Sequence, residues 1–374
     1  MKIILTGATG VLGSQVMYEI LELFIKESIE GKLILISRGK KRKTALERIN
    51  ELLSSDFAPK NLKDAGLEKL DTFIEIADTD LDAVGENFAE RIKGAYFIHS
   101  AGYVNLSTDE EHRQKIFDEN TKITKFILNN FHDSIKKIIY IGTAFSSGER
   151  SGLVENDFHN LGFIPKHRNA YENAKFHSEN FVAQRCKALG LPFQILRPSV
   201  ICGKMLGDEH RYFISKYMVF YLLAKFFYFA AQRNSEQENV RFIMNRNTGL
   251  NIIAVDYVAK VIVSVFRRDD IQQLNIVNHK SLNLVKGLEL IMAEVGYSNY
   301  TIVENTLHFE YQNNTERLYY ESIGKHLKPY LVASAKEYNT VLLNSILEIP
   351  ILDDETFTQM IRYAKLNGFK DIHV

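Results

Sequence analysis

Three glycines spaced three residues apart stand near the start of the chain, between an apolar run and an amphipathic segment. Residues 6–13 read TGATGVLG, and residues 14–26 then repeat apolar side chains at helical spacing. A loop that only reversed the chain would need one glycine. Three at this spacing allow a tight turn at Gly7, a close approach of the backbone to a ligand at Gly10, and close packing of a helix on a sheet at Gly13. The order of strand, glycine loop and helix therefore predicts a βαβ unit whose helix N-terminus faces the pyrophosphate of a dinucleotide.

The first two-thirds of the chain alternate short runs rich in β-branched residues with longer amphipathic stretches. This alternation is typical of a parallel sheet covered by helices. A second long helix is expected over 169–189, where Gly190 and Pro192 end it, and the α/β pattern returns over 251–278. The expected strands are Ile3–Leu5, Leu33–Ile36, Thr72–Ile76, Ala95–His99, Lys137–Ile141, Phe193–Leu196, Ile252–Val255 and Leu274–Val277.

The sequence changes character after Arg197-Pro198. Residues 217–231, YMVFYLLAKFFYFAA, are apolar except for Lys225. A membrane span needs roughly 20 such residues, so we interpret this stretch as a buried or pocket-lining helix, with a helix at a membrane interface as the alternative. The fold class expected is α/β, a doubly wound parallel Rossmann sheet with a smaller, mostly helical C-terminal substrate lobe. We assign the cofactor-binding Rossmann domain to 1–205 and 250–280 and the lobe to 206–249 and 281–374.

Composition excludes several classes of protein. The formal net charge is zero, which gives no electrostatic basis for binding nucleic acid or an anionic membrane. The two cysteines, Cys186 and Cys202, are too few for a disulfide framework and indicate a reducing compartment. The first strand begins at Lys2 and leaves no room for a signal peptide, so we expect a cytoplasmic protein.

Several polar residues are interpreted as structural. The eleven histidines show no metal-ligand spacing, so no metal is expected, and His99 at a strand end is interpreted as a packed histidine. Cys202 is interpreted as a small buried apolar residue rather than a nucleophile. Glu155 is interpreted as a solvated acid, with a substrate contact as the alternative.

The end of the second expected strand is basic. Ser37-Arg38 is followed by four basic residues at 40–43. In nucleotide-binding units of this kind an acidic residue at this point bonds the ribose 2′-hydroxyl and favours NAD. The guanidinium of Arg38 instead offers a fork for a 2′-phosphate, whereas the run 40–43 also fits a solvated loop. We therefore predict NADPH rather than NADH.

Three residues form a candidate catalytic set. Tyr171 and Lys175, in AYENAK, share one face of the expected helix over 169–189. An ammonium beside a phenol favours the phenolate and lowers its pKa from about 10 towards working pH, which makes the tyrosine a usable acid or base. Thr143, in IIYIGTAFSSG at the end of the fifth expected strand, adds a hydroxyl that can polarise a substrate carbonyl.

Together these motifs resemble the extended short-chain dehydrogenase/reductase family, which has TGxxGxxG, then Ser or Thr after the fifth strand, then YxxxK. Further matches cover most of the first 280 residues: IADTDL, FIHSAG, DENTKIT, RPSVICG and AVDYVAK. Asp78 falls where the family's adenine-contacting Asp lies, and Ile123 replaces the glycine of the N-x-x-G-T motif. The resemblance implies catalytic roles for Thr143, Tyr171 and Lys175. It implies cofactor contacts at Thr6, Gly7, Thr9, Gly10, Val11, Leu12, Gly13, Arg38, Asp78, Ser100, Ala101, Gly102, Asn120, Lys175, Pro198 and Ser199.

Within that family, HSAGYVNL, IGTAF, ADTDLDAVGENFAERI and NIIAVDYVAK are most similar to fatty acyl-CoA reductases and to the terminal thioester-reductase domains of peptide and polyketide synthases. HSAG replaces the more usual H-x-A-A, and Gly142 stands where this branch commonly has serine. The branch implies an acyl thioester substrate, on CoA or on a separate carrier protein because the chain shows no carrier motif. The aromatic run 212–229 is then expected to line an acyl pocket, with plain core as the alternative.

The mechanism that this branch implies is hydride transfer from NADPH to the thioester carbonyl. Thr143 and Tyr171 stabilise the oxyanion, Tyr171 donates a proton, and Lys175 tunes Tyr171 and holds the nicotinamide ribose. The thiohemiacetal expels its thiol and leaves an aldehyde, which a second hydride reduces to the alcohol.

Two other functions remain open for this sequence. The first is a nucleotide-sugar epimerase or a hydroxysteroid-type dehydrogenase of the same fold. Sugar 4,6-dehydratases typically carry Asp-Glu after the catalytic threonine, whereas Ala144-Phe145 follow Thr143 here. The second is a non-catalytic NADP-binding sensor, which would not need Thr143, Tyr171 and Lys175 intact.

Overall fold

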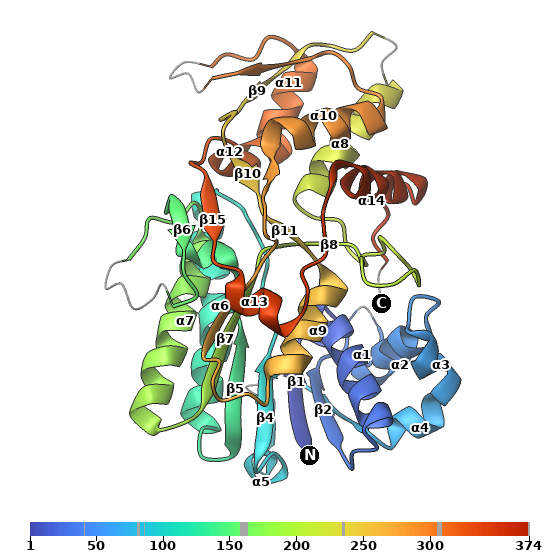
Figure 1. Cartoon of the computed structure of the whole chain (residues 1–374), viewed down its shortest axis with the longest axis vertical. Coiled ribbons are helices and arrows are strands. Elements are labelled where there is room, and N and C mark those ends of the chain that lie inside the picture. Colours follow the sequence, from blue (N-terminus) through green and yellow to red (C-terminus); the bar gives the residue numbers. More distant parts are fainter. Residues whose placement is uncertain are drawn as a thin grey trace.

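A seven-stranded parallel sheet forms one end of the molecule in this computed structural model (Figure 1). The structure describes residues 1–40, 42–80, 83–85, 87–157, 164–233, 236–304 and 309–372. The strand order is β12-β7-β5-β4-β1-β2-β3, and each neighbouring pair is parallel. The chain places β2 and β3 on one side of β1, and then β4, β5, β7 and β12 on the other side. The switch point of the sheet therefore lies between β1 and β4. The strands are β1 (Lys2–Thr6), β2 (Lys32–Ser37), β3 (Ile74–Asp78), β4 (Ala95–His99), β5 (Ile135–Ile141), β7 (Phe193–Pro198) and β12 (Gln273–Ile276).

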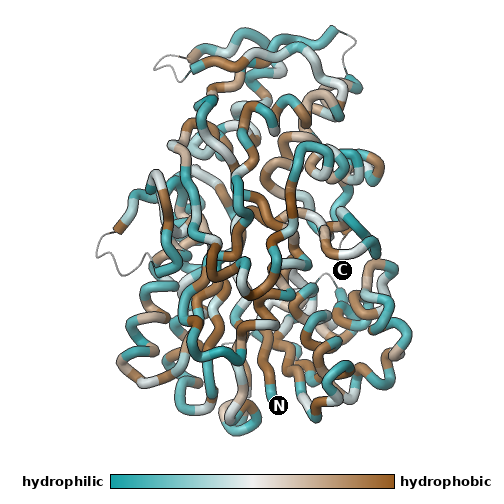
Figure 2. The backbone as a smooth tube through the Cα atoms, in the orientation of Figure 1, coloured by the Kyte–Doolittle hydropathy of each residue, from teal (hydrophilic) through white to brown (hydrophobic). Residues whose placement is uncertain are grey.

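Helices cover both faces of this sheet. Side chains alternate between the faces along a strand, so Ile3 and Leu5 of β1 join one hydrophobic core while Ile4 joins another. The first core contains residues of α1 (Val11–Lys26) and α9 (Val255–Val265), and the second contains residues of α6 (Glu110–Asn130) and α7 (Ala170–Leu189). Figure 2 shows hydrophobic residues concentrated along the central strands and hydrophilic residues along the outer helices. This is the doubly wound α/β architecture that the sequence predicts.

Shorter elements connect the strands of the sheet. The helices between β2 and β4 are α2 (Ala45–Ser54), α3 (Lys60–Ala65), α4 (Leu67–Asp71) and α5 (Phe88–Arg91). After β5 the chain forms the 3₁₀ helix η2 (Ala144–Ser147) and strand β6 (Gly152–Val154), and after β7 it forms β8 (Val200–Cys202).

A second group of elements lies at the opposite end of the molecule (Figure 1). Strand β9 pairs in parallel with β14, and β10 pairs antiparallel with β13. The division of the chain into two lobes at the boundaries given above remains our prediction. The elements are α8 (Phe220–Arg233), β9 (Val240–Ile243), β10 (Gly249–Leu250), β13 (Leu282–Asn283), α10 (Leu284–Val295), β14 (Tyr300–Val303), α11 (Asn314–Tyr319), η4 (Tyr320–Gly324), α12 (Lys325–Leu331) and α14 (Asp354–Leu366).

The last part of the chain also returns to the sheet end. Strand β15 (Lys336–Tyr338) pairs in parallel with β6, and α13 (Val341–Ile346) packs beside β12. The hydroxyl of Tyr257 in α9 donates to the carbonyl of Leu347 at 2.7 Å. The C-terminal segment therefore closes over the loops that follow β5.

Two expected strands differ from the structure. The expected strand Thr72–Ile76 is displaced, because the amides of Thr72 and Phe73 complete the turn that ends α4 and β3 begins only at Ile74. The expected strand Ile252–Val255 exists as β11 (Ile252–Ala254), but it pairs with β8 outside the seven-stranded sheet.

Residues 220–231 of the apolar run lie in α8, which begins at Phe220 and packs against α10 and α14. Phe227 contacts the rings of Phe242, Tyr297 and Tyr319, and the Lys225 ammonium donates to the carbonyl of Phe369 at 3.0 Å. This part of the expected acyl pocket is therefore packed core. Within the described residues, every helix is too short or too polar to cross a membrane.

Candidate active site

The glycine loop closes on itself and against the end of β4. Gly7 has φ +78°, and a Cβ there would lie 2.8 Å from the amide nitrogen of Ala101. A Cβ at Gly13 would lie only 1.9 Å from the carbonyl oxygen of Gly7. Gly10 caps α1 without a side-chain hydrogen bond, and Val11 and Leu12 begin the helix. The first turn of a 16-residue helix thus presents backbone N–H groups at the loop, where a phosphate would be stabilised.

Thr6 joins β1 to β4 at the switch point. Its Oγ1 lies 2.8 Å from Nδ1 of His99 and accepts a hydrogen bond from the amide of Ala101, at 3.2 Å. His99 Nε2 lies 3.2 Å from Thr124 Oγ1. Burial, with the nearby charge of Lys175, lowers the pKa of His99 to about 3, so this histidine is neutral. It is the packed histidine that we expected.

Asp78 and Arg38 lie at the tips of β3 and β2. The Asp78 carboxylate accepts hydrogen bonds from the amides of Gly39 and Ala45, each at 3.0 Å, and so fixes the loop between β2 and α2. The Arg38 guanidinium is largely exposed and pairs with Asp80 at 3.2 Å. The cation that we expected to read the ribose phosphate is therefore accessible to a ligand.

Arg48 is a second cation beside the glycine loop that sequence reasoning missed. Its guanidinium donates to Thr9 Oγ1 at 2.8 Å and to the carbonyl of Arg38 at 2.9 Å. Burial, with the neighbouring charge of Arg38, lowers the pKa of Arg48. An arginine in the first turns of an amphipathic helix gives no sequence signal that separates it from a solvated face.

The helix α7 carries Tyr171 and Lys175 one turn apart. Its N-cap Asn169 accepts a hydrogen bond from the amide of Glu172 at 3.0 Å, as N-cap side chains do. The Lys175 ammonium donates to the carbonyl of Ile141 at 2.8 Å and to the hydroxyl of Tyr140 at 3.3 Å. Burial lowers the pKa of Lys175 to about 8, which Glu179 opposes.

Tyr171 is half-buried, and its hydroxyl bonds to no other described residue. Burial raises the pKa of Tyr171, and the carboxylates of Glu179 and Glu172 raise it further. The lowering of this pKa by Lys175 that we expected is therefore not seen in the chain alone. A neutral phenol at neutral pH is suited to donating a proton.

Thr143 caps η2 and lies beneath the start of α7. Its amide donates to Glu179 Oε1 at 3.3 Å, and its hydroxyl donates to the carbonyl of Pro198 at 3.5 Å. Glu179 also acts on the pKa values of Tyr171 and Lys175. The Lys175 ammonium bonds the carbonyl of Ile141, two residues before Thr143, and Glu179 of the same helix bonds the Thr143 amide. The helix that carries Tyr171 and Lys175 is thus held against the end of β5 at Thr143.

Glu179 is the second functional position that sequence reasoning missed. Its carboxylate pairs with Arg197 Nε at 2.6 Å, with both side chains fully buried, and accepts from Ser146 Oγ at 3.0 Å. A Cβ at Gly142 would lie 2.2 Å from Glu179 Oε1, which explains why glycine replaces the usual serine. The available signal was spacing, because Tyr171, Lys175 and Glu179 follow each other at intervals of four on one helix face.

The loop after β4 passes beside Lys175. A Cβ on Gly102 would lie 3.2 Å from Asn120 Oδ1 and 3.4 Å from Lys175 Nζ. The Asn120 side chain holds both the amide and the carbonyl of Tyr103. Ser100 and Ala101 pack on the glycine loop at Gly7.

The remaining expected residues lie close to the end of β7. Ser199 donates its amide to Ile276 at 3.0 Å, and its buried hydroxyl has no partner among the described residues. Cys202 is buried, and burial raises the pKa of its thiol, so it is not a nucleophile. Glu155 is exposed and accepts from the Asn339 amide at 2.8 Å.

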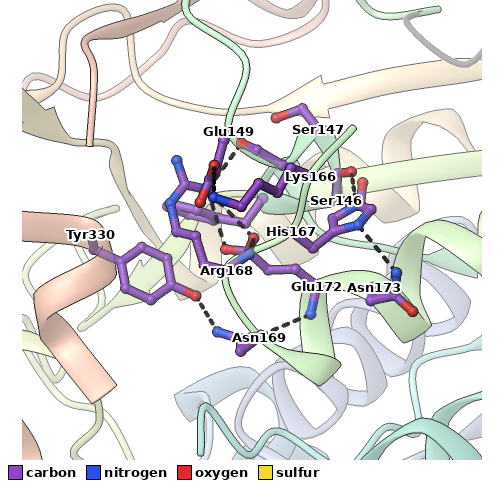
Figure 3. Close-up of polar contacts among 12 residues, drawn as sticks. Ser146, Ser147, Glu149, Lys166, His167, Arg168, Asn169, Glu172, Asn173 and Tyr330 are labelled. Atoms are coloured by element: carbon purple, nitrogen blue, oxygen red, sulfur yellow. Dashed lines mark hydrogen bonds and ion pairs between the residues drawn. The ribbon is translucent and has the colours of Figure 1, made fainter. Parts of the chain in front are cut away.

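A charged cluster adjoins η2 at the start of α7. Figure 3 shows Arg168, Asn169 and Glu172 drawn together there, with Tyr330 of α12 reaching the Asn169 side chain at 2.7 Å. The Arg168 guanidinium donates to the carbonyl of Gly148 at 2.9 Å and pairs with Glu172. The start of α7 is therefore tied to the C-terminal part of the chain.

Comparison with known proteins places this site in context. Residues 5–262 match the model of an NAD-binding family described as male sterility protein. No curated protein sequence matches the chain.

Solved structures are similar in fold along the whole chain. The terminal R domain of the myxalamid PKS-NRPS biosynthetic pathway has a TM-score of 0.68 and 17% identity, covering 100% of this chain and 92% of that one. The UDP-glucuronic acid 4-epimerase from Bacillus cereus, in complex with NAD, has a TM-score of 0.62 and 15% identity, covering 98% of both chains. The UDP-glucose 4-epimerase from Thermotoga maritima has a TM-score of 0.60 and 15% identity, covering 98% and 99%. At these identities the likeness shows the fold alone.

Proposed function

The chain belongs to the NAD-binding male sterility protein family and is an enzyme of the extended short-chain dehydrogenase/reductase type, and we propose from this premise that it reduces acyl thioesters with NADPH. The observation that carries the proposal is that α7, the helix of Tyr171 and Lys175, bonds the end of β5 at Thr143 through Lys175 and Glu179. The products are a free thiol and an aldehyde, or the alcohol after a second reduction.

The chain fits a nicotinamide dinucleotide at its glycine loop. A side chain at Gly7 or Gly13 would collide with the backbone of the glycine loop or of the β4 end. No side chain caps the N-terminus of α1, so its backbone N–H groups are available to a ligand. Thr9, Gly10 and the first turn of α1 would hold the pyrophosphate. When bound, the cofactor supplies the hydride that adds to the substrate carbonyl carbon.

The residues of the chain then act on the carbonyl oxygen. The hydroxyls of Thr143 and Tyr171 donate hydrogen bonds to the oxygen as negative charge develops on it, which is the interaction that lowers the barrier. Tyr171, kept protonated by burial, gives its proton to that oxygen. Collapse of the resulting thiohemiacetal breaks the carbon–sulfur bond and releases the thiol.

A substrate panel tests this proposal. Purified protein with NADPH should oxidise the cofactor in the presence of acyl-CoA or an acyl-carrier protein, and chromatography should detect the aldehyde or alcohol with one free thiol. Ketones and UDP-sugars serve as comparison substrates, because epimerases share the fold. Interconversion of a UDP-sugar without net cofactor oxidation, and no thioester turnover, would replace the proposal with an epimerase.

The preference for NADPH rests on Arg38 and on Arg48, whose guanidinium bonds both Thr9 and the carbonyl of Arg38. Arg38→Ala should raise the KM for NADPH roughly 10- to 150-fold, because a hydrogen bond to a charged group contributes about 1.5–3 kcal/mol. The KM for NADH should change less than about threefold, since a ribose hydroxyl carries no charge. Steady-state kinetics with both cofactors measure the difference.

The matched control for Arg38→Ala is Lys43→Ala. Lys43 lies in the same loop, and its ammonium pairs with Glu51 at 2.6 Å. The control substitution should leave both KM values unchanged. Equal weakening of NADPH and NADH by Arg38→Ala would contradict a phosphate-reading role.

A further inference from the structure

A small recess opens where the C-terminal segment meets the loop after β5. Pairing of β15 with β6, with Lys336 opposite Gly152 and Tyr338 opposite Val154, fixes its outer wall. Phe145 of η2 lines the recess only two residues after Thr143, so the two Cα atoms are at most roughly 7 Å apart. The recess therefore adjoins the carbonyl-polarising hydroxyl.

Two cations line this recess. The Arg168 side chain is only 4% exposed, and its Nε donates to no described residue. The Lys336 ammonium donates to Ser147 Oγ at 2.8 Å and to the carbonyl of Gly148 at 2.6 Å. Both Arg168 and Lys336 belong to the lining, together with the polar side chains of Asn251 and Ser281.

The charges around the recess do not balance. Glu172, whose side chain is fully buried, pairs with Arg168 at 3.4 Å. Burial, and next the nearby Arg168, lower the pKa of Lys336 to about 7, which Glu172 opposes and Arg150 reinforces. Among the described residues Lys336 pairs with no carboxylate, and a buried ammonium without such a partner is costly to a fold. A bound anion would stabilise it.

We propose that this recess binds an oxyanion carried by the substrate, a phosphate or a carboxylate, through Arg168 and Lys336 while the reacting carbonyl lies at Thr143. The inference rests on the proposed function, since it specifies which thioesters the site prefers. Arginine and lysine both bind such groups with charge-assisted hydrogen bonds. Two sources supply this chemistry: a phosphate on the thiol arm, and a carboxylate on the acyl group.

Three thioesters of matched acyl length separate these sources. They are an acyl-pantetheine, the same acyl group on 4′-phosphopantetheine, and a pantetheine thioester whose acyl chain ends in a carboxylate. The wild-type protein should favour one anionic thioester over the neutral one at least about tenfold in kcat/KM, as expected for hydrogen bonds to a charged group. The favoured compound identifies the source.

Variants test the ligands. Lys336→Gln should reduce the anionic-to-neutral ratio of kcat/KM to below about threefold, and Lys336→Arg should largely restore it. Lys166→Gln, which removes an exposed cation paired with Glu149, should leave the ratio unchanged. A wild-type ratio near one, or a ratio that Lys336→Gln does not alter, would overturn the inference.

A direct measurement of ligand binding tests the anion site independently of the proposed thioester reduction, because it requires no turnover. Calorimetry with NADP⁺ saturating, so that the phosphate site of the glycine loop is filled, compares 4′-phosphopantetheine, pantetheine and glutarate. An anionic ligand should bind wild type, and Lys336→Gln should weaken it at least about tenfold even if no thioester is reduced. If neither anion binds, or if Lys336→Gln leaves the binding unchanged, the recess is not an anion site. That result would not bear on thioester reduction, which the substrate panel tests.

Discussion

Tyr171→Phe should lower kcat about 10³-fold while leaving the affinity for NADPH within about twofold of wild type. The substitution removes the hydroxyl that is expected to donate both a hydrogen bond and a proton, and general acid catalysis contributes roughly 10²–10⁴-fold. The Tyr171 hydroxyl bonds to no other described residue, so its removal should leave the fold intact. Single-turnover kinetics measure the chemical step, and cofactor fluorescence measures binding.

Tyr363→Phe is the control for this substitution. Tyr363 lies on α14, outside the seven-stranded sheet and the helices that cover it (Figure 1), and its loss should leave both quantities unchanged. Turnover of Tyr171→Phe near the wild-type rate would contradict the proton-donor role. Loss of NADPH affinity in parallel with turnover would mean that Tyr171 holds the cofactor instead.

Gly13→Ala should raise the Kd for NADPH at least about 100-fold and lower the Tm. The added Cβ would lie 1.9 Å from the Gly7 carbonyl oxygen and 2.6 Å from its carbon, and both are backbone atoms that no rotamer change can move aside. Overpacking of this kind costs about 1–3 kcal/mol. A displacement of about 1 Å in a positioned site can cost 10²-fold in function.

Gly85→Ala is the matched control for the glycine loop. A Cβ at Gly85 would meet no atom of the described residues within 4 Å, so this variant should keep the wild-type Tm and Kd. Cofactor titration and thermal unfolding of the two variants side by side measure both effects. Unchanged NADPH affinity in Gly13→Ala would show that the loop does not hold the pyrophosphate.

The parts of the site that could be predicted are those that depend on residues close together in the sequence. The glycine loop follows from steric limits on three backbone positions, which act within eight residues of each other. Tyr171 and Lys175 follow from helical periodicity, and that helix ends at Gly190 as the sequence predicts. The central strands were predictable because the parallel sheet is buried on both faces and its strands are short apolar runs.

Three features of the site could not be predicted from the sequence. Arg48 reaches Thr9 from another helix, and Glu179 bonds the Thr143 amide across a gap of 36 residues. Lys336 reaches Ser147 from 189 residues away. The run 212–229 was expected to line a pocket, and the buried aromatic side chains of α8 instead pack against α14, α11 and Tyr297, which follows α10. Apolar periodicity alone does not separate these two environments.

The doubly wound sheet, the glycine loop and the helical spacing of Tyr171 and Lys175 could be derived from local sequence, because each depends on the conformations and spacing of neighbouring residues. Their surroundings became visible only once the chain was folded: the buried Glu179–Arg197 pair next to Thr143, the second arginine at the loop, and the cationic recess closed by β15. Those contacts join residues that packing brings together from distant parts of the chain, and one sequence contains no local signal of which distant residues will meet.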